Sequence, residues 1–134
     1  MDPNNRVMVI DDEPIVCERL SSALEKHHLR VETFADPVEA AKRIAEEYFP
    51  VLVTDLKMKG MDGIEILKLV QKISPETKVI IITGFATVEK AKEALKIGAY
   101  DFIAKPFKLS QLRDLVLKAL NPEQGSPREG RDSA

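Results

Sequence analysis

Short apolar runs alternate with helix-like segments along most of this chain, and this alternation constrains the fold more than any other feature of the sequence. Residues 7–10 form a continuous apolar run, Val-Met-Val-Ile, which is typical of a strand covered on both faces. An acidic stretch at 11–13 ends the run. Pro14 then suits the first turn of a helix, and apolar residues recur at helical spacing as far as Lys26. The chain therefore opens with a strand followed by a helix.

The same strand-then-helix unit recurs along the rest of the chain. Further strands are predicted at residues 31–34, 51–53, 79–82 and 100–103. The helices that follow them are predicted to begin near Pro37, Gly63, Thr87 and Leu109. Because a helix-length crossover separates each strand from the next, consecutive strands cannot pair as hairpins. The predicted fold class is α/β, a doubly wound parallel sheet of five strands with five helices on its two faces.

The composition is that of one folded domain and argues against several classes of function. The chain has 134 residues, of which 44% are hydrophobic and 31% charged, as expected for a single globular domain. Lys and Arg (20) nearly balance Asp and Glu (22), so no field of one sign attracts nucleic acid or an anionic membrane. The single cysteine excludes an internal disulfide and a Cys-rich metal site. Because no apolar run reaches about 20 residues, we expect a cytoplasmic protein.

The end of the chain differs from the rest. From Asn121 onward, Pro and Gly recur and apolar residues are almost absent, which is typical of a linker. We therefore expect residues 1–120 to form the folded domain and residues 121–134 to be a flexible tail or linker.

Polar side chains gather where the predicted strands end, and in an open parallel sheet the functional crevice lies beyond those ends. They are Asp11, Asp12 and Glu13 after the first strand, Asp55 after the third, Thr83 and Gly84 after the fourth, and Lys105 and Pro106 after the fifth. Each residue alone has an ordinary explanation as a turn former, a helix cap or a solvated charge. Together they predict one site that contains carboxylates, a hydroxyl and an amine.

The residue types in this set indicate a particular chemistry. Carboxylates crowded at one crevice repel one another unless a cation or a proton neutralises them. A site with oxygen ligands favours a hard divalent ion, and Mg²⁺ binds one or two carboxylates while taking other oxygens from water and a substrate phosphate. Lys105 would add a second positive charge toward the same phosphate, Thr83 a hydroxyl donor and Gly84 open space.

From about Arg6 to Leu120, the chain resembles the receiver domain of two-component response regulators. The matching stretches are residues 11–14, 54–63, 82–84, 98–102 and 105–107. The stretch at 60–63 is most similar to receivers of sigma-54-dependent, NtrC-type activators, while Lys59 departs from the family because many relatives carry proline there. The resemblance implies a flavodoxin-like, CheY-like strand order, 2-1-3-4-5.

The resemblance also implies roles for the residues of the acidic site. Asp55 is expected to accept a phosphoryl group and thereby form an aspartyl phosphate. Asp11 and Asp12 are expected to hold Mg²⁺ together with Asp55 and the backbone carbonyl of Lys57. The implied cofactor is therefore Mg²⁺.

Further roles follow for the residues around this acceptor. Thr83 and Lys105 are expected to read the phosphoryl, and the peptide between Lys105 and Pro106 is expected to be cis. Phe102 holds the position of the switch aromatic. The bulk of Phe85, two positions after the threonine, is expected to shield the phosphoryl from water.

The implied function is that of a signalling switch in a phosphorelay rather than that of a turnover enzyme. A sensor histidine kinase would supply the phosphoryl group, and the domain would catalyse both its own phosphorylation and its later dephosphorylation. The face made by the fourth helix, fifth strand and fifth helix would then control an output domain or partner protein in transcription regulation. We expect no direct nucleic-acid or membrane binding by this domain, and a homodimer linked to phosphorylation.

Three alternatives use similar residues. A phosphatase of the haloacid dehalogenase type also has a strand-end Asp and Mg²⁺, but it needs a second Asp where Lys57 stands. A flavodoxin-like cofactor module needs hydroxyls and glycines after the first strand, where residues 11–13 would repel a phosphate. A degenerate receiver, which only binds other proteins, would not need the intact acidic, hydroxyl and amine set.

Overall fold

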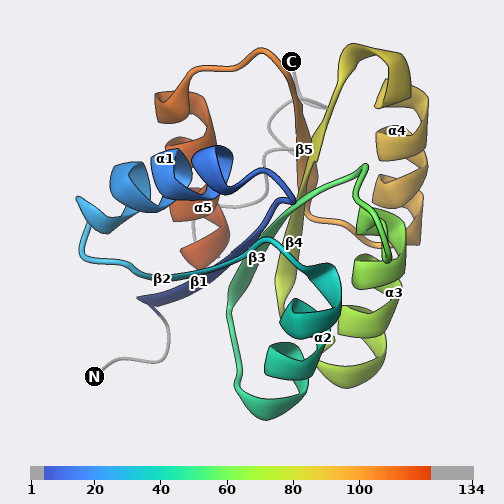
Figure 1. The fold of residues 1–134 in the computed structure, drawn as a ribbon, viewed down its shortest axis with the longest axis horizontal. Helices are drawn as coiled ribbons and strands as arrows, with labels where there is room; N and C mark the ends of the chain where they lie inside the picture. The colour runs from blue at the N-terminus through green and yellow to red at the C-terminus, as the bar shows by residue number, and fades with distance from the viewer. Residues whose placement is uncertain (1–4, 122–134) are drawn as a thin grey trace.

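The computed structural model describes residues 5–121, in which five parallel strands form one sheet (Figure 1). The strand order is β2-β1-β3-β4-β5, so the predicted α/β class and strand order are confirmed. The strands are β1 (Arg6–Ile10), β2 (Arg30–Phe34), β3 (Val51–Asp55), β4 (Lys78–Thr83) and β5 (Asp101–Ala104).

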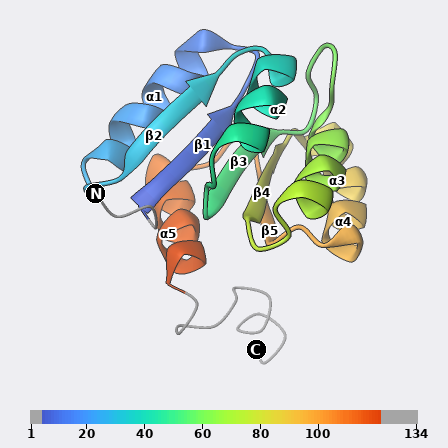
Figure 2. The same cartoon turned by 90° about the horizontal axis from the view of Figure 1, so that it is seen from below.

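Helices cover both faces of the sheet. They are α1 (Pro14–Glu25), α2 (Pro37–Glu46), α3 (Gly63–Ile73), α4 (Val88–Ile97) and α5 (Leu109–Leu120), with a short 3-10 turn, η2 (Phe85–Thr87), before α4. The two views show α1 and α5 on one side of the sheet and α2, α3 and α4 on the other (Figure 1 and Figure 2). The arrangement is the doubly wound one that helix-length crossovers between parallel strands require.

Alternate residues of the inner strands point into two separate cores. Val51 and Val53 of β3 pack in the core with Leu20 of α1 and Val116 of α5. Leu52, between them, packs instead in the core beneath α2, α3 and α4. This alternation follows from the two-residue period of a strand, and it explains why the strands of a sheet covered on both faces are apolar throughout.

Polar and proline residues fix where the helices on one face begin. Pro37 opens α2, and the Asp36 side chain caps that helix by accepting a hydrogen bond from the Val38 N–H at 2.9 Å. Asp62 and Glu65 form a reciprocal capping box at the start of α3. Each of these helices therefore begins immediately after the loop that follows its strand.

The structure differs from the sequence prediction near the ends of the central strands. β3 and β4 extend to Asp55 and Thr83, whereas the apolar runs ended earlier, because the ladder continues through polar residues as far as the pair Asp55–Ile82. The turn η2 was not predicted, since three residues are too few to show helical periodicity. As a result α4 begins at Val88, one residue later than expected.

The expected division of the chain into a domain and a tail stays a prediction. α5 ends at Leu120, and residues 122–134 of the expected tail lie outside the described residues. Among residues 5–121, no helix is both long and apolar enough to cross a membrane.

Candidate functional site at the carboxyl ends of the strands

Four of the predicted site residues lie at one edge of the sheet because of the parallel register. Asp11 directly follows β1, Asp55 ends β3, Thr83 ends β4 and Lys105 directly follows β5. Thr83 is paired with Ala104, the residue before Lys105, so the last strands end level with each other. The predicted convergence is what a parallel sheet of this order produces.

The acidic part of the site contains three aspartates. Carboxylate oxygens of Asp11, Asp12 and Asp55 all lie within 4.8 Å of one another. Asp11 is fully buried and Asp55 is 7% exposed, whereas Asp12 faces solvent. The Asp11 Oδ1 accepts a hydrogen bond from the Glu13 N–H at 2.9 Å, but its buried Oδ2 has no hydrogen-bond partner among the described residues.

The backbone of Asp11 is fixed from both sides. Its N–H donates to the carbonyl of Phe34 at 3.0 Å, which ties the end of β1 to the end of β2. Its carbonyl accepts a hydrogen bond from the thiol of Cys17, a buried residue of α1, at 3.3 Å. The Asp11 carboxylate therefore points into the site from a rigid position.

Burial and like charge both disfavour the ionised form of these carboxylates. Burial, together with the negative charge of Asp55, raises the pKa of Asp11 to about 6, although the hydrogen bond from Glu13 opposes the shift. Burial also raises the pKa of Asp55, and the positive charge of Lys105 opposes this increase. The single positive charge of Lys105 therefore does not balance the three carboxylates of the site.

The donor set fits Mg²⁺. All candidate ligands are oxygens, the ion prefers carboxylates with water, and the unpartnered Oδ2 of Asp11 is a buried acceptor that a cation would satisfy. The Lys57 side chain is exposed, as expected if only its backbone carbonyl faces an ion. The assignment of Asp11, Asp12, Asp55 and Lys57 as ligands stays a prediction.

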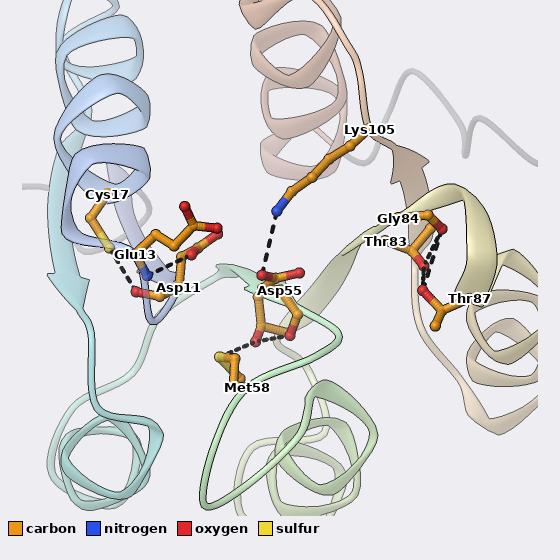
Figure 3. Close-up of polar contacts among 10 residues, drawn as sticks. Asp11, Glu13, Cys17, Asp55, Met58, Thr83, Gly84, Thr87 and Lys105 are labelled. Carbon is orange, nitrogen blue, oxygen red and sulfur yellow. Dashed lines mark hydrogen bonds and ion pairs between the residues drawn. The ribbon is translucent and has the colours of Figure 1, made fainter.

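Lys105 approaches the Asp55 carboxylate from the end of β5. Its Nζ lies 3.5 Å from the Oδ2 of Asp55, and Figure 3 shows the long side chain reaching down from the end of β5. The Lys105 N–H donates to the carbonyl of Thr83 at 2.7 Å, and the peptide between Lys105 and Pro106 is cis, as the resemblance implied. The lysine is therefore anchored to the end of β4.

Comparison with known proteins identifies the family. The model of the response regulator receiver domain matches residues 7–117. This chain belongs to the response regulator receiver family. Its membership decides against the haloacid dehalogenase and flavodoxin-like alternatives, which are other families.

Individual relatives agree with the family assignment of this receiver domain. The C4-dicarboxylate transport transcriptional regulatory protein DctD of Pseudomonas aeruginosa is 35% identical, over 89% of this chain and 26% of its own length. A receiver domain structure from Clostridium thermocellum is 30% identical with a TM-score of 0.84, and covers 89% of this chain and 96% of its own. The structure of the beryllofluoride-activated NtrC4 receiver domain dimer is 37% identical with a TM-score of 0.81, covering 87% and 96%.

These matches confirm the predicted likeness to NtrC-type receivers. This receiver spans only about a quarter of the length of the curated relatives that it matches.

Thr83, the predicted reader of the phosphoryl, is buried in this receiver, and its hydroxyl is hydrogen-bonded to groups other than Asp55. Its hydroxyl lies 2.6 Å from the hydroxyl of Thr87, and Figure 3 shows this pair to the right of Asp55, which lies between the pair and Asp11. Next to it, a side chain added at Gly84 would meet no atom within 4 Å, which agrees with the predicted open space.

The two aromatic residues that were given roles in this receiver differ in burial. Phe102 is half-buried beside the core that contains Ala91 and Ala94 of α4, so it lies on the α4 side of the sheet, and its switch role stays a prediction. Phe85 is 89% exposed, and its expected shielding of the phosphoryl stays a prediction. The turn η2 carries Phe85 outward into solvent.

Thr87 is the residue of this receiver site that sequence reasoning missed. It was predicted only as the approximate start of a helix, and nothing in the sequence gives the direction of its hydroxyl. The available signal was its place four residues after Thr83, at a helix start, where a threonine hydroxyl usually caps the helix.

Proposed function

We propose that this receiver accepts a phosphoryl group on Asp55 from the phosphohistidine of a sensor histidine kinase, in a reaction that needs Mg²⁺. The observation that carries the proposal is the position of Asp55, whose carboxylate lies between two other aspartates and the Lys105 ammonium, 3.5 Å away. A nucleophile, acidic ligands and a cation for the transferred group are the parts that phosphoryl transfer requires.

The residues would act together in the transfer. An oxygen of the Asp55 carboxylate attacks phosphorus in line, so that the new O–P bond forms while the P–N bond to the donor histidine breaks. Lys105 moves from the carboxylate to an oxygen of the phosphoryl, and the Thr83 hydroxyl turns to another. When bound by Asp11, Asp12, Asp55 and the Lys57 carbonyl, Mg²⁺ would supply positive charge to the transferring group.

The product would be a switch with a limited lifetime. An aspartyl phosphate is an acyl phosphate that water can hydrolyse, and Phe85, the residue expected to shield it, is 89% exposed. The same site would therefore catalyse both gain and loss of the phosphoryl. The domain would act as a self-modifying signalling module rather than as a turnover enzyme.

The proposed output surface is the face made by α4, β5 and α5. Only Ala91 and Ala94 of α4 are fully buried, so the helix is held by little apolar area and can shift at low cost. Phe102 pairs in register with Ile81, two residues before Thr83, and so lies where a movement of α4 would be felt. The phosphoryl need favour the shifted state by only a few kcal/mol to make it the majority.

The proposed consequence is control of transcription through an output domain or partner protein. It rests on the name of the relative DctD, a transcriptional regulatory protein about four times as long as the stretch it shares with this chain. A cytoplasmic location, a phosphorylation-linked homodimer and the absence of direct nucleic-acid binding by the domain are parts of the same proposal.

The acceptor is tested by phosphorylation with acetyl phosphate and Mg²⁺, followed by intact mass measurement. The wild type should gain one phosphoryl group and Asp55→Asn none. Asp62→Asn is the matched control, because Asn caps α3 as well as Asp does and the acceptor is untouched. Incorporation into Asp55→Asn equal to that of the wild type would overturn the assignment, and no incorporation into the wild type would favour the degenerate receiver.

The output surface is tested by amide chemical shifts with and without beryllofluoride, which mimics a phosphoryl on a carboxylate. Shifts should extend from Asp55 through α4 and β5 in the wild type and be absent in Asp55→Asn. Shifts confined to the loops around Asp55 would contradict the proposed face.

A further inference from the structure

Thr83 and Thr87 share a closed set of hydrogen bonds with the carbonyl of Gly84. The two hydroxyl oxygens are 2.6 Å apart, and they lie 3.2 Å (Thr83) and 3.3 Å (Thr87) from the Gly84 oxygen. One hydroxyl donates to the other, which donates to the carbonyl, so both hydroxyl protons are used within the set. In Figure 3 this triangle lies to the right of Asp55, and none of its dashed lines joins it to Asp55.

The triangle holds Thr83 in a position where it cannot serve a phosphoryl on Asp55. Thr83 is completely buried, and a buried hydroxyl is costly to leave without a partner. Thr87 supplies that partner while the acceptor is unmodified. The Thr83 backbone cannot follow its side chain, because its carbonyl accepts the Lys105 N–H at 2.7 Å. Only a side-chain rotation is therefore needed to bring the hydroxyl over.

The same hydrogen bonds leave the start of α4 uncapped. Thr87 is the N-cap residue of α4, but its side chain makes no capping hydrogen bond. Its backbone has φ −119° and ψ 17°, whereas the side-chain N-caps of α2 and α3, Asp36 and Asp62, are extended with ψ 113° and 175°. A threonine at an N-cap normally accepts from the second or third N–H of the helix, here those of Glu89 and Lys90.

We propose that Thr87 is a positioning residue that releases the Thr83 hydroxyl to the phosphoryl and then caps α4. We call this exchange of hydrogen-bond partners the hand-over. The inference rests on the proposed function, in which Thr83 turns toward phosphorylated Asp55. When Thr83 leaves, the Thr87 hydroxyl loses its partner, the turn η2 opens to extended backbone at Thr87, and its oxygen accepts an N–H of the first turn of α4.

The hand-over links the phosphoryl to the helix without a loss of hydrogen bonds. The bond between the two hydroxyls is replaced by one from Thr83 to the phosphoryl, which is charge-assisted, and by one from an α4 amide to Thr87. At its other end α4 is tied to α3, because the Gln71 side chain donates to the Ile97 carbonyl at 2.6 Å. The N-terminal end of α4 is thus the end that changes.

Hydrogen exchange at the Glu89 and Lys90 amides, followed by NMR with and without Mg²⁺ and beryllofluoride, tests the proposal. In the wild type, beryllofluoride should slow exchange at one of these amides about fivefold, as expected for a threonine N-cap. Thr87→Ser should behave in the same way, because it keeps the hydroxyl. Thr87→Val should show no such slowing in either state.

The decisive variant is Thr83→Val, which removes the partner of Thr87 and keeps the shape of the side chain. It should slow exchange at the same amides about fivefold without beryllofluoride, because the Thr87 hydroxyl is free to cap from the start. Unchanged exchange in this variant overturns the inference, and so does full slowing in Thr87→Val. Exchange in the central strands, unaltered in every variant, excludes a general loss of structure.

The two proposals fail in different ways. If beryllofluoride shifts no amides around Asp55 in the wild type, the proposed phosphoryl acceptor is wrong, while the comparison of Thr83→Val with the wild type still decides the hand-over. If beryllofluoride binds and the Thr83→Val comparison shows no change, the acceptor stands and the hand-over is wrong.

Discussion

Asp11 is the residue whose charge opposes folding most directly, because its buried carboxylate lies beside those of Asp12 and Asp55. Asp11→Asn keeps the oxygen that accepts from the Glu13 N–H and replaces the unpartnered Oδ2 with a donor that faces carboxylates. We expect the free energy of unfolding without Mg²⁺ to rise by about 1–2 kcal/mol. Urea denaturation in the presence of a chelator measures it. Asp62→Asn should change little, and a less stable Asp11→Asn would contradict the charge argument.

The raised pKa of Asp11, about 6 against the ordinary value of 3.8, also predicts how the site responds to pH. Because the folded protein binds this proton more tightly than the unfolded chain does, the contribution of Asp11 to stability without metal rises as the pH falls from about 7 to 4. If Asp11 is a ligand, Mg²⁺ must displace the same proton, so the Mg²⁺ affinity should fall about tenfold between pH 7 and pH 5.

Besides burial, the charges of Asp55 and Glu13 raise the pKa of Asp11, and the charge of Lys105 lowers it. Titration of Mg²⁺ at several pH values, followed by NMR or calorimetry, measures the affinity. Asp11→Asn should bind the ion more weakly with a flatter pH dependence. An affinity in the wild type that does not change between pH 7 and pH 5 would argue against Asp11 as a ligand.

Single residues of the site could be predicted where the strand ends determine their place. Asp55, Thr83 and Lys105 follow apolar runs, so the parallel register alone brings them to one edge. The directions of side chains could not be predicted in the same way. Whether the Thr83 hydroxyl points to Asp55 or to Thr87 depends on one rotation about χ1, which no pattern of residue types encodes.

At the scale of elements, α4 is held at its C-terminal end by a glycine-dependent contact. Gly98 has φ 134°, and a side chain added there would collide with the Gln71 amide that donates to the Ile97 carbonyl. Gly98→Ala should therefore lower the free energy of unfolding by about 1–3 kcal/mol. Urea denaturation measures the change. Gly84→Ala is the matched control, since open space and an ordinary φ of −82° should make it nearly neutral. Equal stability of the two variants would contradict the role given to Gly98.

Elements were predictable to the extent that their hydrophobic period was long enough to detect. The continuous apolar runs of β1 and β4 gave strands, and the Asp36–Pro37 pair gave the start of α2, because each has one local physical cause. The ends of β3 and β4 extend beyond the apolar runs because the neighbouring strand pairs with polar residues as well as with apolar ones. η2 depends on the hydrogen bonds around Gly84, which appear only in three dimensions.

At the scale of the whole molecule, the site joins two halves that are otherwise packed separately. The sheet divides the core into a layer beneath α1 and α5 and a layer beneath α2, α3 and α4. The hydrogen bond from the Lys105 N–H to the Thr83 carbonyl lies at the edge where both layers end, and it links the lysine beside Asp55 to the end of β4. If Asp55 is phosphorylated, the resulting structural change can therefore be transmitted to α4 through few contacts. A small modification would in this way alter a large surface.

This arrangement leads to a prediction about assembly. If phosphorylation changes the face made by α4, β5 and α5, a second copy with the same change offers a self-complementary surface, as twofold symmetry requires. A solved relative, the beryllofluoride-activated NtrC4 receiver, is a dimer. We expect this receiver to be monomeric alone and dimeric with Mg²⁺ and beryllofluoride, which light scattering after size exclusion measures as a doubled mass. Asp55→Asn should remain monomeric under both conditions, whereas a dimer of this variant would show that assembly does not depend on the phosphoryl site.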